Sequence, residues 1–366
     1  MMVPVLLLII ALFFLLWQSV LDPAMRVLKE RAGIPHGEHG PRITQGVTVA
    51  IIVAIVAFMA SPRKWFEPPP PVLASYGADS LWMGMDSALI DNIDGEREEL
   101  VRYGRELIRN TSYYLGPKGR VAQITNGMDC ENCHLTAGTM PWGNNYGAVW
   151  STYPKFRARS GGKETVAKRV NDCVERSLNG TALDTAGKEM QAILAYMEWL
   201  GTGIEKGKKP KGSGLVELPF LDRAADPVHG EAIYTAKCES CHQKDGEGVK
   251  AVDGITYQYP PLWGTHSYNI GAGLFRLGRF TGYVKNNMPQ GATWENPLLT
   301  DEEAWDVAAY VNSRQRPSRD LSKDWPKFAG KPVDHPFGPY ADSFPESQHK
   351  FGPFGPIAEV KKNAKP

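Results

Sequence analysis

Residues 130–134 read Cys-Glu-Asn-Cys-His, and residues 238–242 repeat the pattern as Cys-Glu-Ser-Cys-His. In a Cys-x-x-Cys-His motif the two cysteines attach covalently to the vinyl groups of a c-type haem, and the histidine binds the iron. Paired Cys-x-x-Cys motifs also occur in zinc sites and redox dithiols, but neither alternative explains a histidine directly after both motifs. The sequence therefore predicts two covalently bound haem c groups. Their attachment residues are Cys130, Cys133, His134, Cys238, Cys241 and His242.

Each motif stands between two segments with helical periodicity. A helix is expected from about residue 95, and a closing helix, which Asp184 can cap, runs to Leu200. The second motif follows an expected helix at 226–236, and a capping box at 300–303 starts another closing helix. A helix, a haem motif and a closing helix are the layout of a class I cytochrome c domain. The chain therefore contains this module twice.

We predict an all-α protein with two class I cytochrome c domains in tandem, preceded by a transmembrane helical hairpin and followed by an extended C-terminal tail. The linker between the domains is rich in lysine and glycine and is expected to be exposed and flexible. The expected segments are a membrane anchor with two transmembrane helices (1–66), a linker (67–94), the first cytochrome domain (95–205), a linker (206–225), the second cytochrome domain (226–316) and the tail (317–366).

The membrane prediction rests on two apolar runs, at residues 1–20 and 46–60. About 20 apolar residues span a bilayer. The first run could instead be a secretory signal peptide, but it lacks the usual charged segment ahead of it. The loop between the runs carries more Lys and Arg than the segment after the second run, which places the loop in the cytoplasm. We expect the protein in a bacterial inner membrane with the haem domains in the periplasm, where covalent haem c is assembled.

After Arg316 the chain has no convincing periodicity but keeps many prolines and aromatic residues. A purely disordered segment would contain fewer aromatic residues. We expect an extended tail that wraps over the haem domains and becomes disordered near Ala358.

The second axial ligand of each iron sets what a haem can do. For the second haem, Met288 precedes a proline in the loop before the closing helix, where cytochrome c domains usually present the axial thioether. Met288 could instead simply fill core space, and Lys285 is a weaker candidate ligand.

No equivalent Met-Pro loop precedes the closing helix of the first domain. Its place is taken by a helical segment in which Val166, Val170, Cys173 and Val174 share one stripe. Cys173 is the fifth cysteine, left over after the haem motifs, and could be a buried unreactive thiol. We predict that its thiolate binds the first iron. A thiolate lowers the reduction potential, so electrons should run from the first haem to the second.

Overall charge gives little information, because 41 Lys and Arg face 40 Asp and Glu. This balance indicates no polyanionic partner, and no nucleic acid is expected. Locally, residues 155–176 hold seven Lys and Arg against three acidic residues. Such a run is often only a solvated face, but beside a candidate sulfur ligand it suggests an anion pocket.

Six segments resemble the dihaem thiosulfate dehydrogenases, which oxidise two thiosulfates to tetrathionate and in some members work in reverse. The most specific of them is 169–177, which reads Arg-Val-Asn-Asp-Cys-Val-Glu-Arg-Ser. The segments are 130–139, 153–159, 169–177, 261–264, 287–289 and 304–308.

This resemblance implies His134 and Cys173 as ligands of the active-site haem, and His242 and Met288 as ligands of the electron-exit haem. It further implies that Arg159, Arg169 and Ser177 hold the anionic substrate. Thiosulfate or tetrathionate and a redox partner, such as cytochrome c or a membrane respiratory complex, are the expected partners. Most members of the family are soluble periplasmic proteins, so the expected anchor departs from their pattern. The alternative is a non-catalytic, membrane-anchored dihaem subunit that carries electrons for a respiratory complex.

Overall fold

The computed structural model describes residues 27, 30–32 and 79–364. The chain divides into a unit of residues 1–70 and a unit of residues 71–366. The predicted anchor lies almost entirely outside the described residues, as do residues 67–78 of the linker predicted at 67–94. Among the residues that are described, no helix combines the length and the apolar character that crossing a membrane requires.

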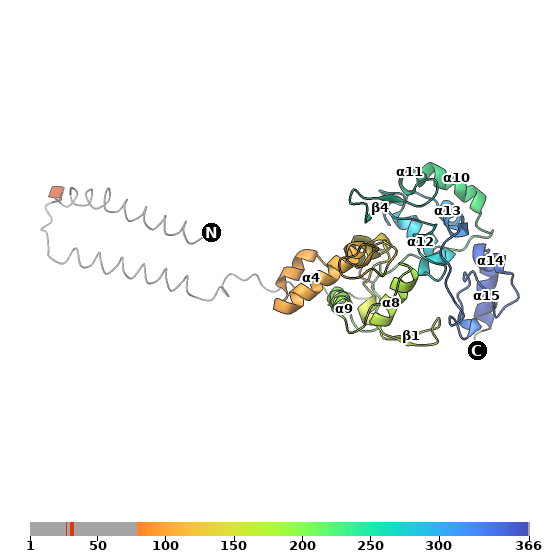
Figure 1. Cartoon of the computed structure of the whole chain (residues 1–366), viewed down its shortest axis with the longest axis horizontal. Helices are drawn as coiled ribbons and strands as arrows, with labels where there is room; N and C mark the ends of the chain where they lie inside the picture. The colour runs from red at the N-terminus through yellow and green to blue at the C-terminus, as the bar shows by residue number, and fades with distance from the viewer. Residues whose placement is uncertain (1–26, 28–29, 33–78, 365–366) are drawn as a thin grey trace. The chain divides into compact units, whose positions relative to one another are not determined.

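The first cytochrome module is built on two crossed helices, α4 (Gly95–Arg109) and α9 (Lys188–Leu200), which lie against each other (Figure 1). The crossing needs a glycine, because a Cβ on Gly104 would lie 2.0 Å from the carbonyl oxygen of Ala192. The N-cap residue of α9 is Gly187 and not Asp184. The Asp184 carboxylate instead accepts a hydrogen bond from the backbone amide of Ala186 (3.0 Å). The predicted capping residue is therefore wrong by three positions, although the helix is confirmed.

The second module repeats the same crossing with α10 (Pro227–Lys237) and α13 (Asp301–Ser313) (Figure 1). Here a Cβ on Gly230 would lie 2.0 Å from the carbonyl oxygen of Asp306. The capping box at the start of α13 is present, since Thr300 and Glu303 exchange hydrogen bonds. The duplication predicted from the motifs is thus visible in the packing of the helices.

Shorter elements complete both modules around these helix pairs. The structure is mostly helical, as expected, but it also contains two short antiparallel hairpins, β1–β2 and β3–β4. The first module contains η3 (Ser87–Asn92), α5 (Thr111–Leu115), η4 (Cys130–Asn132), α6 (Leu135–Gly138), α7 (Val149–Thr152), β1 (Lys155–Arg157), β2 (Gly162–Glu164) and α8 (Val166–Arg176). The second contains α11 (Glu239–His242), β3 (Val249–Lys250), β4 (Tyr257–Tyr259), η5 (Gly273–Phe275) and α12 (Leu277–Asn287).

The two modules contact each other directly. Tyr283 on α12 donates a hydrogen bond from its hydroxyl to the carbonyl of Asn132, inside the first haem motif (2.8 Å). Cys133 of that motif packs against the apolar core of the second module. The helix that ends just before Met288 therefore rests on the first haem motif.

Part of the linker between the modules is fixed, contrary to the flexible segment that its composition predicts. The carbonyl of Gly212 accepts hydrogen bonds from the amide of Trp142 (2.8 Å) and from the side chain of Asn145 (2.7 Å). Pro210 and Ser213 are buried beside it. A run of lysines and glycines reads as flexible from composition alone, but here its backbone groups find partners on the first module.

The C-terminal segment is not simply extended. It contains η6 (Phe328–Gly330) and two helices, α14 (Glu346–Phe351) and α15 (Gly355–Asn363) (Figure 1). Phe354 and Ile357 are buried in the core of the second module. The expected disorder near Ala358 is wrong, because α15 continues past this residue. Helices of six and nine residues are too short to give a clear periodic pattern.

A buried carboxylate ties the helix pair of the second module together. Asp306 on α13 has no exposed surface. Its carboxylate accepts two hydrogen bonds from the guanidinium of Arg223 (2.8 and 2.9 Å) and one from the backbone amide of Asp226 (2.8 Å). It also forms a hydrogen bond with Nδ1 of His229 (2.8 Å). Burial alone would raise the pKa of Asp306, but these hydrogen bonds outweigh it and lower the pKa.

We expect Asp306→Ala to lower the free energy of unfolding at pH 7 by about 3 kcal/mol, because several charge-assisted bonds are lost at once. A depressed carboxyl pKa stabilises the fold above the unfolded value of about 4, and this stabilisation disappears as the pH falls through the folded value. The difference between wild type and variant should therefore be constant from pH 7 to about pH 5 and shrink below about pH 4. Denaturant titrations at several pH values measure it.

Glu302→Ala is the matched control, because this carboxylate is 68% exposed and lies 3.8 Å from the same Arg223 guanidinium. Its loss should change stability by less than about 0.5 kcal/mol. Equal effects of the two substitutions would show that the buried carboxylate has no special role.

Candidate active site

A cavity of about 320 Å³ is lined mainly by the first module and partly by the linker and the second module. Cys130, Cys133 and His134 of the first motif line it, and so does Cys173 from α8. Most of the remaining wall is apolar and includes Ile108, Leu115, Met128, Val149, Val170, Val174, Leu178, Ile193 and Met197. The predicted attachment residues and the predicted sulfur ligand of the first haem therefore share one cavity.

The imidazole of His134 is held for metal binding. Its Nδ1 donates a hydrogen bond to the carbonyl of Asn144 (2.5 Å), and its ring lies against that of Tyr146, with 4.5 Å between the centroids. Nε2 forms no hydrogen bond within the described part of the chain, so it is free to bind iron. Burial lowers the pKa of His134 to about 4, which keeps the ring neutral at pH 7 as a ligand must be.

The alternatives to haem attachment fit the motif cysteines less well. Burial raises the pKa of both Cys130 and Cys133 to about 12, whereas the attacking sulfur of a redox dithiol has a lowered pKa. A structural zinc site would need the two motifs to converge. In the part of the chain that the structure describes, no three His, Cys, Asp or Glu side chains gather as a metal site would require. The cavity, with its apolar walls and free imidazole nitrogen, fits a haem c group.

Cys173 lies in the middle of α8, which begins where Thr165 accepts a hydrogen bond from the amide of Lys168. Its helix neighbours Val170 and Val174 are buried, while Cys173 itself is half-buried and lines the cavity. A cysteine that merely filled the core would be enclosed on all sides. The helix places Arg169 one turn before Cys173 and Ser177 one turn after it, and all three line the cavity.

The histidine of the second motif is oriented in the same way as that of the first, by a hydrogen bond from Nδ1 to a backbone carbonyl. His242 is buried, and its Nδ1 donates a hydrogen bond to the carbonyl of Pro260 (2.9 Å). Met288 follows the last residue of α12 and packs against the core of the second module, as Cys238 does. Lys285 is occupied elsewhere, since its ammonium group contacts the carbonyl of Leu299 (2.7 Å) and the carboxylate of Asp301 (2.7 Å). Of the two candidate ligands, the structure favours Met288.

The cavity is strongly cationic. Its charged lining residues are Lys155, Arg157, Arg159, Arg169, Lys209, Arg276 and Arg279 against the single carboxyl group of Asp129. Sequence reasoning named Arg159 and Arg169 but missed Lys209, which comes from the linker, and Arg276 and Arg279, which come from the second module. The available signal was that Arg279 lies on the helix that leads into Met288 and Arg276 lies directly before it.

Burial, and to a smaller extent repulsion by neighbouring cations, disfavours the charged form of two of these lining residues. Burial, and then the nearby guanidinium groups of Arg169 and Arg176, lower the pKa of Arg159 to about 10. Burial also lowers the pKa of Lys155, followed by repulsion from Arg157, Arg169, Lys209 and Arg279. An anion bound in this cavity would relieve that repulsion.

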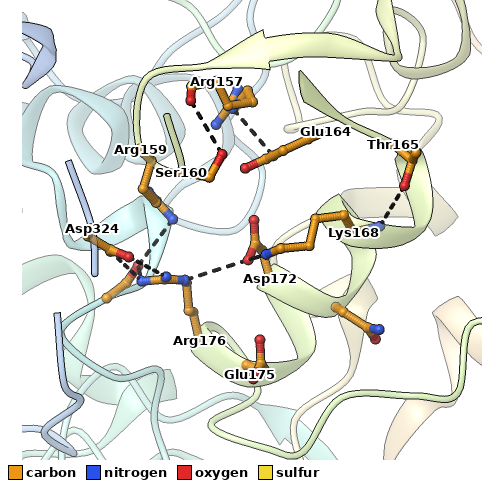
Figure 2. Close-up of polar contacts among 12 residues, drawn as sticks. Arg157, Arg159, Ser160, Glu164, Thr165, Lys168, Asp172, Glu175, Arg176 and Asp324 are labelled. Atoms are coloured by element: carbon orange, nitrogen blue, oxygen red, sulfur yellow. Dashed lines mark hydrogen bonds and ion pairs between the residues drawn. The ribbon is translucent and has the colours of Figure 1, made fainter. Parts of the chain in front are cut away.

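The C-terminal segment supports the cationic wall (Figure 2). Asp324 forms a bidentate ion pair with Arg176 at the end of α8, with both N–O distances 2.8 Å. The next residue, Trp325, donates a hydrogen bond from its amide to the carbonyl of Arg159 (2.7 Å). The Arg159 guanidinium lies 3.5 Å from the carbonyl of Gly271 in the second module. Both modules and the tail therefore fix the position of Arg159.

The fold and this site define a c-type cytochrome, with cytochrome c domains that imply covalently bound haem c. Comparison with known proteins agrees with this class. Residues 120–205 match the SoxA/TsdA cytochrome c domain family, and residues 227–315 match the cytochrome c family.

Among individual proteins, the chain is 39% identical over 219 residues to thiosulfate dehydrogenase of Allochromatium vinosum, a match that covers 58% of this chain and 79% of the relative. It is 36% identical over 219 residues to thiosulfate dehydrogenase of Stutzerimonas stutzeri, covering 60% of this chain and 68% of the relative. The chain belongs to the thiosulfate dehydrogenase family.

A solved structure is also similar, the thiosulfate dehydrogenase (TsdBA) from Marichromatium purpuratum in its as-isolated form. The TM-score is 0.59 with 32% sequence identity, and the match covers 65% of this chain. It covers 50% of the chain of that structure, so the present chain spans about half of its length.

Proposed function

We propose that this protein oxidises thiosulfate to tetrathionate, or catalyses the reverse reaction, in the cavity between His134 and Cys173. The main observation behind this proposal is that the candidate sulfur ligand Cys173 and the cationic side chains line the same cavity. Two haem c groups, attached at residues 130–134 and 238–242 with Cys173 and Met288 as further iron ligands, would supply two one-electron acceptors. Family membership supports this reading.

The reaction needs two dianions in one place. Two thiosulfates lose one electron each, a bond forms between their terminal sulfurs, and no proton is exchanged. Arg159, Arg169 and Ser177 hold the first anion in this proposal, and the fixed guanidinium groups offset the repulsion between the two anions. Because Arg169 is one helical turn from Cys173, an anion bound to Arg169 has its reacting sulfur close to the cysteine sulfur.

The two modules are coupled by α12. This helix contacts the first haem motif through Tyr283 and ends just before Met288, the candidate ligand of the second haem. A rigid connection of this kind keeps the two haem sites at a constant distance. We propose that the second module delivers the electrons to a redox partner, a cytochrome c or a membrane respiratory complex.

We propose further that the haem domains face the periplasm and are tethered to a bacterial inner membrane. The support comes from the sequence: apolar runs at residues 1–20 and 46–60 precede the cytochrome region, and the cationic loop between them favours the cytoplasmic side. We keep the cytochrome domains at 95–205 and 226–316 as part of this proposal, with η3 (Ser87–Asn92) of the preceding segment packed on the first of them. The protein then differs from soluble members of the family by its tether.

The competing function is a non-catalytic electron carrier, and a direct assay separates the two. The purified full-length protein should turn over thiosulfate with a one-electron acceptor, or tetrathionate with a reduced dye. Its mass should exceed that of the polypeptide by two haem groups. A protein that carries both haems but turns over neither sulfur compound would be a carrier.

A further inference from the structure

The proposed reaction requires two thiosulfate dianions at once, and the residues assigned so far account for one of them. Arg159, Arg169 and Ser177 all belong to the first module and line the cavity together with Cys173. The other anion also needs counter-charges, since two unshielded dianions repel each other strongly in a partly buried site. Further cations of the same cavity are candidates to supply them.

Three of these cations come from three separate parts of the chain. Lys155 lies on β1, Lys209 lies in the linker, and Arg279 lies on α12 of the second module. Within the described residues, Lys155 and Lys209 form no ion pair, and the ion pair of Arg279 is a 3.8 Å contact with Glu217, whose side chain is 83% exposed. The pKa of Lys155 is lowered by burial and then by repulsion from Arg157, Arg169, Lys209 and Arg279. These three cations therefore line one cavity and are poorly compensated by the carboxylates of the described chain.

The two remaining cations of the cavity have other partners. Arg276 is bound to Asp334 in the C-terminal segment, with its Nε 2.8 Å from the carboxylate. Arg157 lies 3.8 Å from the buried carboxylate of Glu164. Their charges are largely offset inside the protein, so we do not count them as anion ligands.

The backbone that carries the three cations is fixed. The carbonyl of Lys208, next to Lys209, accepts a hydrogen bond from the hydroxyl of Ser151 (2.7 Å). The amide of Gly278, next to Arg279, donates to the carboxylate of Asp334 (3.1 Å). Strand pairing of β1 with β2 holds Lys155. A site on fixed backbone loses less entropy on binding than a site on a mobile loop.

We propose that Lys155, Lys209 and Arg279 form a second anion subsite, which holds the second thiosulfate. This inference rests on the proposed function and deepens it, because it makes the active site a joint product of both cytochrome modules and the linker. Tetrathionate carries a sulfonate group at each end. It should therefore span both subsites, whereas a single sulfate occupies only one of them.

Binding of two dianions of equal charge to the fully oxidised protein tests the subsite without turnover. Calorimetric titrations with tetrathionate and with sulfate would be compared for wild type and for the double variant Lys209→Gln/Arg279→Gln. We expect the double variant to bind tetrathionate about tenfold more weakly or worse, because charge-assisted bonds at one end are lost. Sulfate should still bind one subsite, with an affinity within about twofold of wild type.

Lys208→Gln is the matched control, since it removes one positive charge from the neighbouring exposed position outside the cavity lining. It should change neither affinity. Equal weakening of tetrathionate and sulfate in the double variant would overturn the inference in favour of a diffuse electrostatic field. Unchanged tetrathionate binding would overturn it as well. If the double variant binds tetrathionate and turns over thiosulfate like wild type, the second subsite is wrong but the proposed function stands. If the wild-type protein neither binds tetrathionate nor turns over thiosulfate, the proposed function itself is contradicted.

Discussion

Replacing Cys173 with alanine should lower kcat/KM for thiosulfate at least about 100-fold, since even residues that only support a metal ligand cost 10- to 100-fold when removed. The reason is positional. Cys173 lines the cavity together with His134, and the residue is half-buried and not enclosed in the core. Steady-state assays with thiosulfate and a one-electron acceptor measure the effect.

Val170→Ala provides a control on the same helix. Val170 also lines the cavity, so the substitution removes a comparable volume without removing a candidate ligand. It should leave kcat/KM within a few-fold of wild type. An alanine at position 173 that keeps wild-type kcat/KM would remove Cys173 from the active site and favour the electron-carrier alternative.

Arg169→Gln should lower kcat/KM by about 30- to 100-fold, the equivalent of about 2 to 3 kcal/mol for a hydrogen bond between charged groups. Arg169 is part of the cavity lining one helical turn from Cys173. The pKa of Arg169 is raised, and the largest cause is its electrostatic interaction with the Cys173 side chain. The loss should appear mainly as a higher KM if the guanidinium holds the substrate in its ground state.

Lys163→Gln is the matched control for this substitution. Lys163 lies on the adjacent hairpin and is exposed, and it is not part of the cavity wall. Lys163 carries the same charge as Arg169, so removing either charge would have the same long-range electrostatic effect on a bound dianion. Equal rises in KM for the two variants would show that Arg169 does not contact the substrate.

The parts of the site that lie close together in the sequence could be predicted. The two Cys-x-x-Cys-His motifs predict haem attachment by themselves. The spacing of Arg169, Cys173 and Ser177 predicts that these residues share one face of a helix. The capping box at Thr300 fixed the start of α13 correctly. Local chemistry determines these features, so a single sequence is enough to find them.

The parts of the site that depend on long-range packing could not be predicted. Lys209 appeared to belong to a flexible linker, and Arg279 lies 120 residues from Arg159, in the other module. The ion pair between Arg176 and Asp324 joins residues that are 148 positions apart. Periodicity and composition report which face of an element is buried, but they do not report which distant element covers it.

The C-terminal segment illustrates the same limit. Its prolines and aromatic residues correctly indicated contact with the haem domains, and Phe354 and Ile357 are buried there. Its two short helices and its role in holding Arg159, Arg176 and Arg276 depend on tertiary contacts. A segment that looks like a covering tail is thus part of the support of the active site.

Electron paramagnetic resonance of the oxidised protein tests the central claim most directly, because the claim is that the Cys173 sulfur binds the iron held by His134. Wild type should give two low-spin haem signals, one of them with the g-values of histidine and thiolate ligation. In Cys173→Ala that signal should disappear while the signal of the second haem is unchanged. Two unchanged low-spin signals in the variant would contradict the account.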